Sequence, residues 1–212
     1  MIDTHGIKSP KCYMSLANKL TFFRIILTPV FFIFYQLPNW FSAWFINGSA
    51  WTVPVIIFIY IVSEVTDLLD GIAARKCKET SDFGKLFDPF ADTLMQLTCF
   101  LCFVLDGIFP AYLFLIIIYR EFGVLFIRNL MLKKGIAMGA KLSGKIKTIM
   151  YITAGGFALA VMGIQRTGIF EFMYQYFYIT ANVIFIISVI ISILSFIEYI
   201  FTYRKADEDA RH

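Results

Sequence analysis

Four aspartates stand at helical spacings within one short stretch of the chain. Asp67 and Asp70 are three residues apart, and Asp88 and Asp92 are four apart. Residues three or four apart share a helix face, so two antiparallel helices joined by a turn around 78–84 would aim four carboxylates into one cavity. Such a cluster of negative charge is costly unless cations bind to it. Carboxylate-only ligation favours Mg²⁺ or Mn²⁺ over zinc, and four carboxylates suit the two-ion arrangement used in phosphoryl displacement.

Small residues and an arginine accompany these acids. Gly71 follows Asp67 by one helical turn, and Ala74 follows Asp70 in the same way. Small side chains there would let a bulky group approach the helix backbone, although such residues also serve helix packing in membranes. Arg75 would either bind a phosphate through its forked guanidinium or extend to the membrane surface, and we favour phosphate binding.

The elements that position these residues must lie in a membrane. The 212 residues are 59% hydrophobic and only 16% charged, with a mean hydropathy of +0.73, whereas soluble domains are about 45–50% apolar and about 25% charged. This composition excludes disorder, a collagen-like repeat and a nucleic-acid-binding tail. We expect an all-α polytopic protein with six transmembrane helices, because a span needs about 20 mostly apolar residues. The candidate spans are 20–37, 50–64, 90–105, 110–128, 148–164 and 172–197.

The placement of Lys and Arg predicts the topology. Six spans put both termini on one side, and 18 of the 19 basic residues fall on or toward that side, with only Arg166 opposite. Because basic residues concentrate in cytoplasmic segments, both termini are predicted to be cytoplasmic, in a multi-pass protein of the cell (inner) membrane. The predicted organisation is an interfacial helix over 1–19, a six-helix domain over 20–203 and a cytoplasmic tail over 204–212.

The central motif resembles that of a known family. The pattern D-x2-D-G-x2-A-R-x8-G-x3-D-x3-D, which runs from Asp67 to Asp92, is similar to the signature of the CDP-alcohol phosphotransferases. The resemblance implies six transmembrane helices, a homodimer and an active site at the cytoplasmic face. It also implies that Asp67, Asp70 and Asp88 hold two Mg²⁺ or Mn²⁺ ions, with Asp92 contacting the second ion and acting as general base. The residues expected beside the CDP moiety of the lipid are Asn18, Thr21, Arg24, Thr66, Gly71, Ala74, Arg75, Ser81 and Gly84.

Flanking segments resemble those of bacterial phosphatidylglycerophosphate synthases. They are the N-x-L-T-x-x-R stretch from Asn18 to Arg24, the R-E-F helix that begins at Arg120, and the G-K-x-K-T segment from Gly144 to Thr148. This resemblance implies CDP-diacylglycerol and glycerol 3-phosphate as substrates. It also implies direct in-line displacement to phosphatidylglycerophosphate and CMP.

Basic residues are the candidates for binding the acceptor phosphate. They are Arg120, Arg128, Lys141, Lys145 and Lys147. Arg120 and Arg128 are eight residues apart, about two turns along one helix face. The lysines are equally explained by topology and contact with anionic lipid. Arg120 is alternatively paired with Glu121 or with a motif carboxylate.

Other functions remain open at this stage. The acceptor is alternatively an inositol phosphate, serine, choline or phosphatidylglycerol. A divalent-cation transporter would use the same acids, although such sites tend to lie at the midplane within internal repeats, and no repeat is visible. Cys99 and Cys102 form a C-x-x-C inside an apolar stretch, where packing is favoured over a redox or zinc role.

Overall fold

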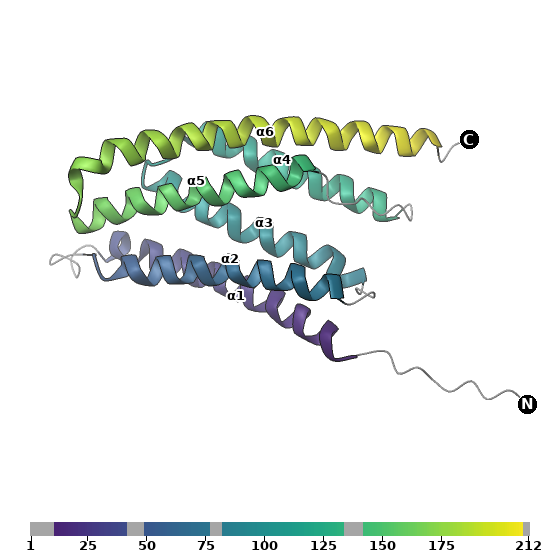
Figure 1. Ribbon diagram of the computed structural model, residues 1–212, viewed down its shortest axis with the longest axis horizontal. Coiled ribbons are helices and arrows are strands. Elements are labelled where there is room, and N and C mark those ends of the chain that lie inside the picture. The colour runs from purple at the N-terminus through teal and green to yellow at the C-terminus, as the bar shows by residue number, and fades with distance from the viewer. Residues whose placement is uncertain (1–10, 42–48, 77–81, 134–141, 210–212) are drawn as a thin grey trace, which may run out of the picture.

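The computed structural model describes residues 11–41, 49–76, 82–133 and 142–209, and every regular element in these ranges is helical. The elements are α1 (Lys11–Trp40), α2 (Thr52–Lys76), α3 (Asp82–Leu105), α4 (Ala111–Lys133), α5 (Leu142–Thr167), the 3₁₀ turn η1 (Glu171–Met173) and α6 (Tyr174–Asp209). The predicted all-α class is therefore confirmed within the described ranges, which contain six α-helices, while the number of six membrane spans stays a prediction. The start of α1 and the end of α6 lie at the same end of the bundle (Figure 1).

Several helices are longer than the apolar runs that predicted them. α6 continues to Asp209 and α4 to Lys133, because helical hydrogen bonds extend into water where the apolar pattern ends. α3 begins at Asp82, so that Gly84 lies in the helix and the predicted turn around 78–84 is too long. An acidic residue at a helix start is favoured by the helix dipole. α1 begins at Lys11 and runs without a break past residue 19.

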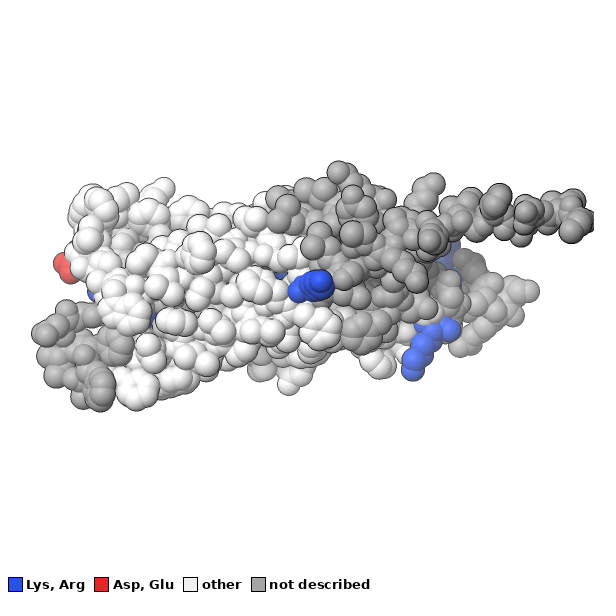
Figure 2. Space-filling model, turned by 90° about the horizontal axis from the view of Figure 1, so that it is seen from below, with Lys and Arg blue, Asp and Glu red and all other residues white. Residues whose placement is uncertain are grey.

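Within the described residues, four helices are long and apolar enough to cross a membrane. These segments are Lys19–Trp40, Phe87–Leu105, Ser143–Thr167 and Glu171–Lys205, and α2 adds a shorter apolar helix, Thr52–Thr66. α4 has a comparable length but carries Arg120, Glu121 and Arg128. Large apolar side chains are exposed along the outside of the bundle, including Ile26, Phe58, Tyr119, Ile190 and Phe201. Figure 2 shows a face on which charged side chains are few. Apolar surface of this extent marks contact with lipid, and the chain is a membrane protein.

The bundle consists of two groups of three helices. α1 packs along both α2 and α3, which form the first half with it, while α6 packs along α5 and α4 to form the second half. α3 lies between the two halves, where it contacts α4 and α5 (Figure 1). The seam between the halves is therefore made mainly by α3 on one side and by α4 and α5 on the other.

Aromatic side chains hold the seam together in the bundle interior. The rings of Phe109 and Phe185 stack with centroids 3.9 Å apart and planes only 2° from parallel. Phe100 meets both of these rings and that of Tyr151 edge-on. Aromatic pairs in such geometries contribute about 0.5–1.5 kcal/mol beyond their buried area. The free thiol of Cys99 is buried among these residues, in agreement with a packing role.

A second set of contacts ties the halves at the end of the bundle opposite to the start of α1 and the end of α6. The guanidinium of Arg166 on α5 donates to the Tyr35 carbonyl oxygen at 2.9 Å and to Thr52 Oγ1 at 3.0 Å. It also lies 4.6 Å from the centre of the Tyr35 ring and 3.5 Å from an Asp106 carboxylate oxygen. Arg166, the basic residue set apart by the charge pattern, thus joins α5 to α1, α2 and the α3–α4 connection. We call Arg166, Tyr35, Thr52 and Asp106 the far-end clamp.

Candidate active site

One cavity of about 330 Å³ opens in the seam, and all six α-helices contribute to its wall. This volume suits a small molecule or headgroup. Seven of the predicted site residues with charged side chains line it from the two halves of the bundle: Arg24 from α1, Asp88 and Asp92 from α3, Arg120 and Arg128 from α4, and Lys145 and Lys147 from α5. The structure therefore gathers acidic and basic candidates, which lie far apart in sequence, around one space.

The acidic side of the cavity is held by α1. The hydroxyl of Thr21 donates to an oxygen of Asp88, and the guanidinium of Arg24 forms an ion pair with Asp92. Arg24 is almost fully buried, whereas the Asp92 side chain is 44% exposed toward the cavity. Thr21 and Arg24 are three residues apart on α1, and Asp88 and Asp92 are four residues apart on α3. Each pair therefore lies on one face of its helix, so the two pairs can contact each other. Two predicted nucleotide contacts thus lie directly against two predicted metal ligands.

Several predicted site residues have no described side chain. Asp67, Asp70, Gly71, Ala74 and Arg75 lie on the last part of α2, where only the backbone helix is described, and the same holds for Asn18 on α1 and Gly84 on α3. Ser81 and Lys141 lie outside the described residues altogether. Ser63, one helical turn before Asp67, lines the cavity together with its neighbour Glu64. The hydroxyl of Thr66 bonds to the Val62 carbonyl of its own helix, and Thr66 is not among the lining residues.

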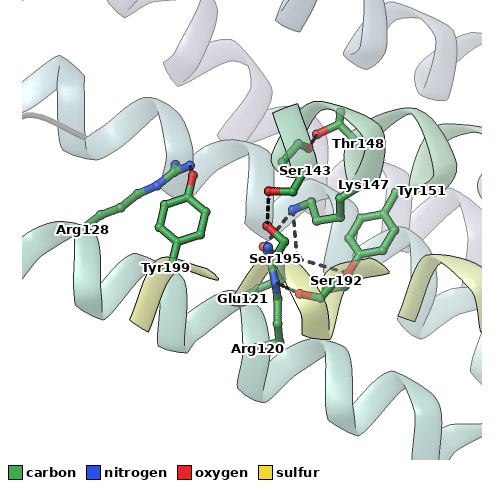
Figure 3. A network of polar contacts seen from close by, with 11 residues as sticks. Arg120, Glu121, Arg128, Ser143, Lys147, Thr148, Tyr151, Ser192, Ser195 and Tyr199 are labelled. Carbon is green, nitrogen blue, oxygen red and sulfur yellow. Dashed lines mark hydrogen bonds and ion pairs between the residues drawn. The ribbon is translucent and has the colours of Figure 1, made fainter. Parts of the chain in front are cut away.

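The basic side of the cavity contains a buried network centred on Glu121 (Figure 3). Its carboxylate accepts hydrogen bonds from Arg120 Nη1 at 2.9 Å, from Lys147 Nζ at 2.9 and 3.1 Å, and from Tyr151 Oη at 3.2 Å. Arg120 Nε also donates to the Ser192 carbonyl oxygen at 3.0 Å, and Tyr151 Oη lies 2.9 Å from Ser192 Oγ. The alternative pairing of Arg120 with Glu121 is therefore the one observed.

Arg128 and Lys145 have different surroundings from Arg120 and Lys147. Arg128 Nη2 donates to Tyr199 Oη at 2.9 Å, and its guanidinium lies 5.3 Å from the centre of the same ring. Lys145 is exposed at the cavity wall. Among the described residues, neither of these two cations contacts a carboxylate. They are the basic groups best placed to receive an anion from outside.

Sequence reasoning missed part of this wall. The sequence predicts Glu121 only as a partner of Arg120, and it predicts no role for Tyr151, Ser192 or Gln96. A signal for Tyr151 is its place four residues after Lys147, on the same helix face. A signal for Glu121 is an acidic residue inside an apolar helix, which is costly unless it has a function or a partner.

The arrangement suits the binding of phosphate groups beside divalent cations. Carboxylates on one side are ligands for hard cations, and guanidinium and ammonium groups on the other side bind phosphate oxygens. Among the described side chains, no group of three or more His, Cys, Asp or Glu is close enough to hold a metal ion. Two of the four predicted ligands, Asp67 and Asp70, belong to the part of α2 without described side chains.

Comparisons with known proteins agree with this chemistry. The family model of CDP-alcohol phosphatidyltransferases matches residues 14–194. A protein of Treponema pallidum named CDP-diacylglycerol–glycerol-3-phosphate 3-phosphatidyltransferase is 35% identical over 198 residues, which cover 90% of this chain and 89% of the relative. Proteins of the same name from Bacillus subtilis and Haemophilus influenzae are 34% and 32% identical, over 66% and 85% of this chain and over 74% and 89% of their own lengths. The resemblance seen in the aspartate pattern is thereby confirmed, and the chain belongs to the CDP-alcohol phosphatidyltransferase family, the membrane enzymes of phospholipid biosynthesis.

Proposed function

We propose that this enzyme transfers the phosphatidyl group of CDP-diacylglycerol to glycerol 3-phosphate, giving phosphatidylglycerophosphate and CMP. The observation that carries the proposal is the single cavity in which Asp88 and Asp92 face Arg128 and Lys145. A lipid diphosphate and a phosphorylated alcohol are both anionic, and this cavity offers cation ligands for one and cationic side chains for the other. The names of the relatives support glycerol 3-phosphate as the acceptor.

The acidic side fits two divalent cations by the chemistry of its donors. Asp67, Asp70, Asp88 and Asp92 would hold Mg²⁺ or Mn²⁺, since carboxylates are the ligands that these hard ions prefer. The chemistry that such ions supply is neutralisation of charge on the diphosphate and on the departing CMP. Asp88 and Asp92 line the cavity from successive turns of α3, and Ser63 brings the preceding turn of α2 to the same wall.

Residues of α1 and α2, together with Ser81 and Gly84, would bind the nucleotide part of the lipid. Thr21 and Arg24 contact Asp88 and Asp92, and from these positions they would also border the nucleotide. The remaining residues proposed to contact the CDP moiety are Asn18, Thr66, Gly71, Ala74, Arg75, Ser81 and Gly84. The acyl chains would stay in the bilayer beside the apolar outer surface of the bundle.

Asp92 is proposed as the general base. Its half-exposed carboxylate faces the cavity and would take the proton of the acceptor hydroxyl, after exchanging its contact with Arg24 for one with the acceptor. That hydroxyl oxygen would attack the β-phosphorus in line and release CMP. Arg128 and Lys145 would bind the acceptor phosphate directly, and Arg120 and Lys147 would contribute positive charge from the deeper wall.

The proposed orientation in the membrane follows from charge. Asp88 and Lys145 lie within about two helical turns of the start of α3 and α5, at the end of the bundle where α1 begins and α6 ends. The excess of basic residues at this end supports a cytoplasmic active site in a six-span protein. Soluble glycerol 3-phosphate would enter there, while the lipid donor reaches the cavity from the bilayer.

The test is release of CMP by the protein purified in mild detergent with CDP-diacylglycerol and each acceptor in turn. We expect activity with glycerol 3-phosphate, its loss in excess EDTA and its recovery on addition of Mg²⁺ or Mn²⁺. We also expect Asp92→Asn to lower kcat by about 100- to 10,000-fold, the range for loss of a general base. The matched control is Glu171→Gln, which removes an exposed acid at the other end of the bundle.

Each part of the proposal can fail separately. Activity with an inositol phosphate, serine, choline or phosphatidylglycerol, but not with glycerol 3-phosphate, would overturn the acceptor. Normal CMP release by Asp92→Asn would overturn the role of the base. Full turnover in excess EDTA would overturn the proposed requirement for divalent cations.

A further inference from the structure

Glu121 is an acid with four polar contacts at the wall of the cavity. Oε1 accepts from Arg120 Nη1, Lys147 Nζ and Tyr151 Oη, and Oε2 accepts from Lys147 Nζ. Its side chain is 7% exposed, and that of Arg120 is 4% exposed. A carboxylate buried this deeply is tolerated because its lone pairs are satisfied by charged and polar donors.

The basic side of the cavity carries four cationic side chains: Arg120, Arg128, Lys145 and Lys147. Two of them, Arg120 and Lys147, are bonded to Glu121. Lys147 places its ammonium on both carboxylate oxygens and lies 4.9 Å from the centre of the Tyr151 ring. Arg120 uses Nη1 for Glu121 and Nε for the Ser192 carbonyl oxygen. Both cations are therefore held in fixed positions by groups of α4, α5 and α6.

The other two cations are held differently. Arg128 donates to a neutral partner, the Tyr199 hydroxyl, and Lys145 is exposed. A phosphate that enters the cavity can bond to these two groups without displacing an anion. To bond to Lys147, it would have to compete with Glu121 for the same ammonium protons.

We propose that Glu121 is a built-in counter-anion that keeps Lys147 and Arg120 from binding free anions, so that the acceptor phosphate is bound by Arg128 and Lys145. The inference rests on the proposed function, in which a phosphorylated alcohol occupies this cavity. Glu121 is a positioning residue, because it acts through the cations that it holds. It makes the cavity selective, since inorganic phosphate meets two available cations on this wall instead of four.

The experiment compares Glu121→Gln, Lys147→Gln and the double variant, each purified in the same detergent with Mg²⁺. Two quantities are measured: the affinity for inorganic phosphate, by calorimetry without turnover, and the KM for glycerol 3-phosphate in the CMP-release assay. Glu121→Gln releases Lys147, so we expect phosphate to bind about tenfold more tightly, which is the lower end of what one hydrogen bond to a charged group is worth. Lys147→Gln removes the ammonium group that compensates the negative charge of Glu121. We expect this charge to repel phosphate and so to weaken its binding.

The double variant tests whether Glu121 acts as a counter-anion to Lys147 or whether Lys147 binds the acceptor phosphate directly. It removes the acid and its ammonium partner together, so phosphate affinity and KM should return to within about threefold of the wild type, since replacing both partners of a buried bond is nearly neutral. A rise in KM of more than tenfold in the double variant would show that Lys147 itself binds the acceptor and would overturn the proposal. Unchanged or weaker phosphate binding in Glu121→Gln would also overturn it.

The two proposals fail in different ways. If wild-type protein does not use glycerol 3-phosphate, the proposed function fails, while the calorimetry still tests the counter-anion. If Glu121→Gln does not fold, the double variant alone decides by its KM and its phosphate affinity. A folded double variant with wild-type values supports the proposal.

Discussion

Gly155 and Gly156 are neighbours on α5, and we expect substitution by alanine to have opposite effects on stability at these two positions. A Cβ added at Gly155 would lie 2.6 Å from Tyr60 Oη and 3.3 Å from Tyr60 Cζ, whereas a Cβ added at Gly156 meets no atom within 4 Å. Tyr60 is buried, and its hydroxyl donates to the Ile152 carbonyl oxygen at 3.3 Å. The ring therefore has little room to withdraw, and α2 packs on α5 only because residue 155 has no side chain.

The expected magnitudes follow from these distances. Glycine to alanine inside a helix gains about 0.8–1 kcal/mol, and nothing opposes this gain at Gly156. At Gly155 overpacking costs about 1–3 kcal/mol, and loss of the Tyr60 hydrogen bond costs about 1 kcal/mol, so the net destabilisation is about 1–3 kcal/mol. For a chain of this size each kcal/mol moves Tm by about 2–4 °C. We expect Tm to fall by several degrees in Gly155→Ala and to rise slightly in Gly156→Ala.

The assay is thermal unfolding of each purified variant in one mild detergent. A third variant, Gly155→Ala with Tyr60→Phe, removes the atom closest to the added methyl group and should recover part of the lost Tm. Equal Tm values for the two single variants would refute the packing of α2 on α5 described above. The same conclusion would follow if Tyr60→Phe made Gly155→Ala still less stable.

Three further predictions concern the core, the far-end clamp and the cavity. Phe185→Ala should cost about 3–5 kcal/mol, as large-to-small core substitutions do, because the ring stacked on Phe109 is lost; an unchanged Tm would contradict this. Arg166→Gln should lower Tm more than Asp106→Asn, because it removes the bonds from α5 to α1 and α2 as well as the ion pair with Asp106, and the reverse order would show that the carboxylate dominates. Arg128→Gln should raise the KM for glycerol 3-phosphate by about tenfold or more without changing the KM for CDP-diacylglycerol, and an equal rise in both would place Arg128 outside the acceptor site.

The sequence predicts the helices and the grouping of acids because both depend on local spacing. Apolar runs identify the spans, and intervals of three and four place Asp88 and Asp92 on one face of α3. Helix ends are predicted less well, because a helix such as α6 continues past its last apolar turn to Asp209. Hydropathy reports contact with lipid, whereas helix length depends on backbone hydrogen bonds.

The Glu121 network shows why the rest of the site could not be predicted. Arg120 and Glu121 are adjacent in sequence, and adjacent residues do not face each other along a helix, so their pairing depends on surrounding groups. Those groups, Lys147, Tyr151 and Ser192, come from α5 and α6. Only the packing of α4, α5 and α6 brings them to one carboxylate.

The far-end clamp has a mechanical consequence for the bundle. Arg166 fastens the two halves at one end of the seam, and stacked rings fill the middle, while the other end is hollow. Because the contacts between the halves are concentrated at the far-end clamp and in the middle of the seam, we expect any opening to change the angle between the halves about the clamp. If the cavity widens, we expect the halves to separate at the hollow end without repacking of Phe109 against Phe185, and a molecule with its tails in the bilayer would then enter sideways along the seam.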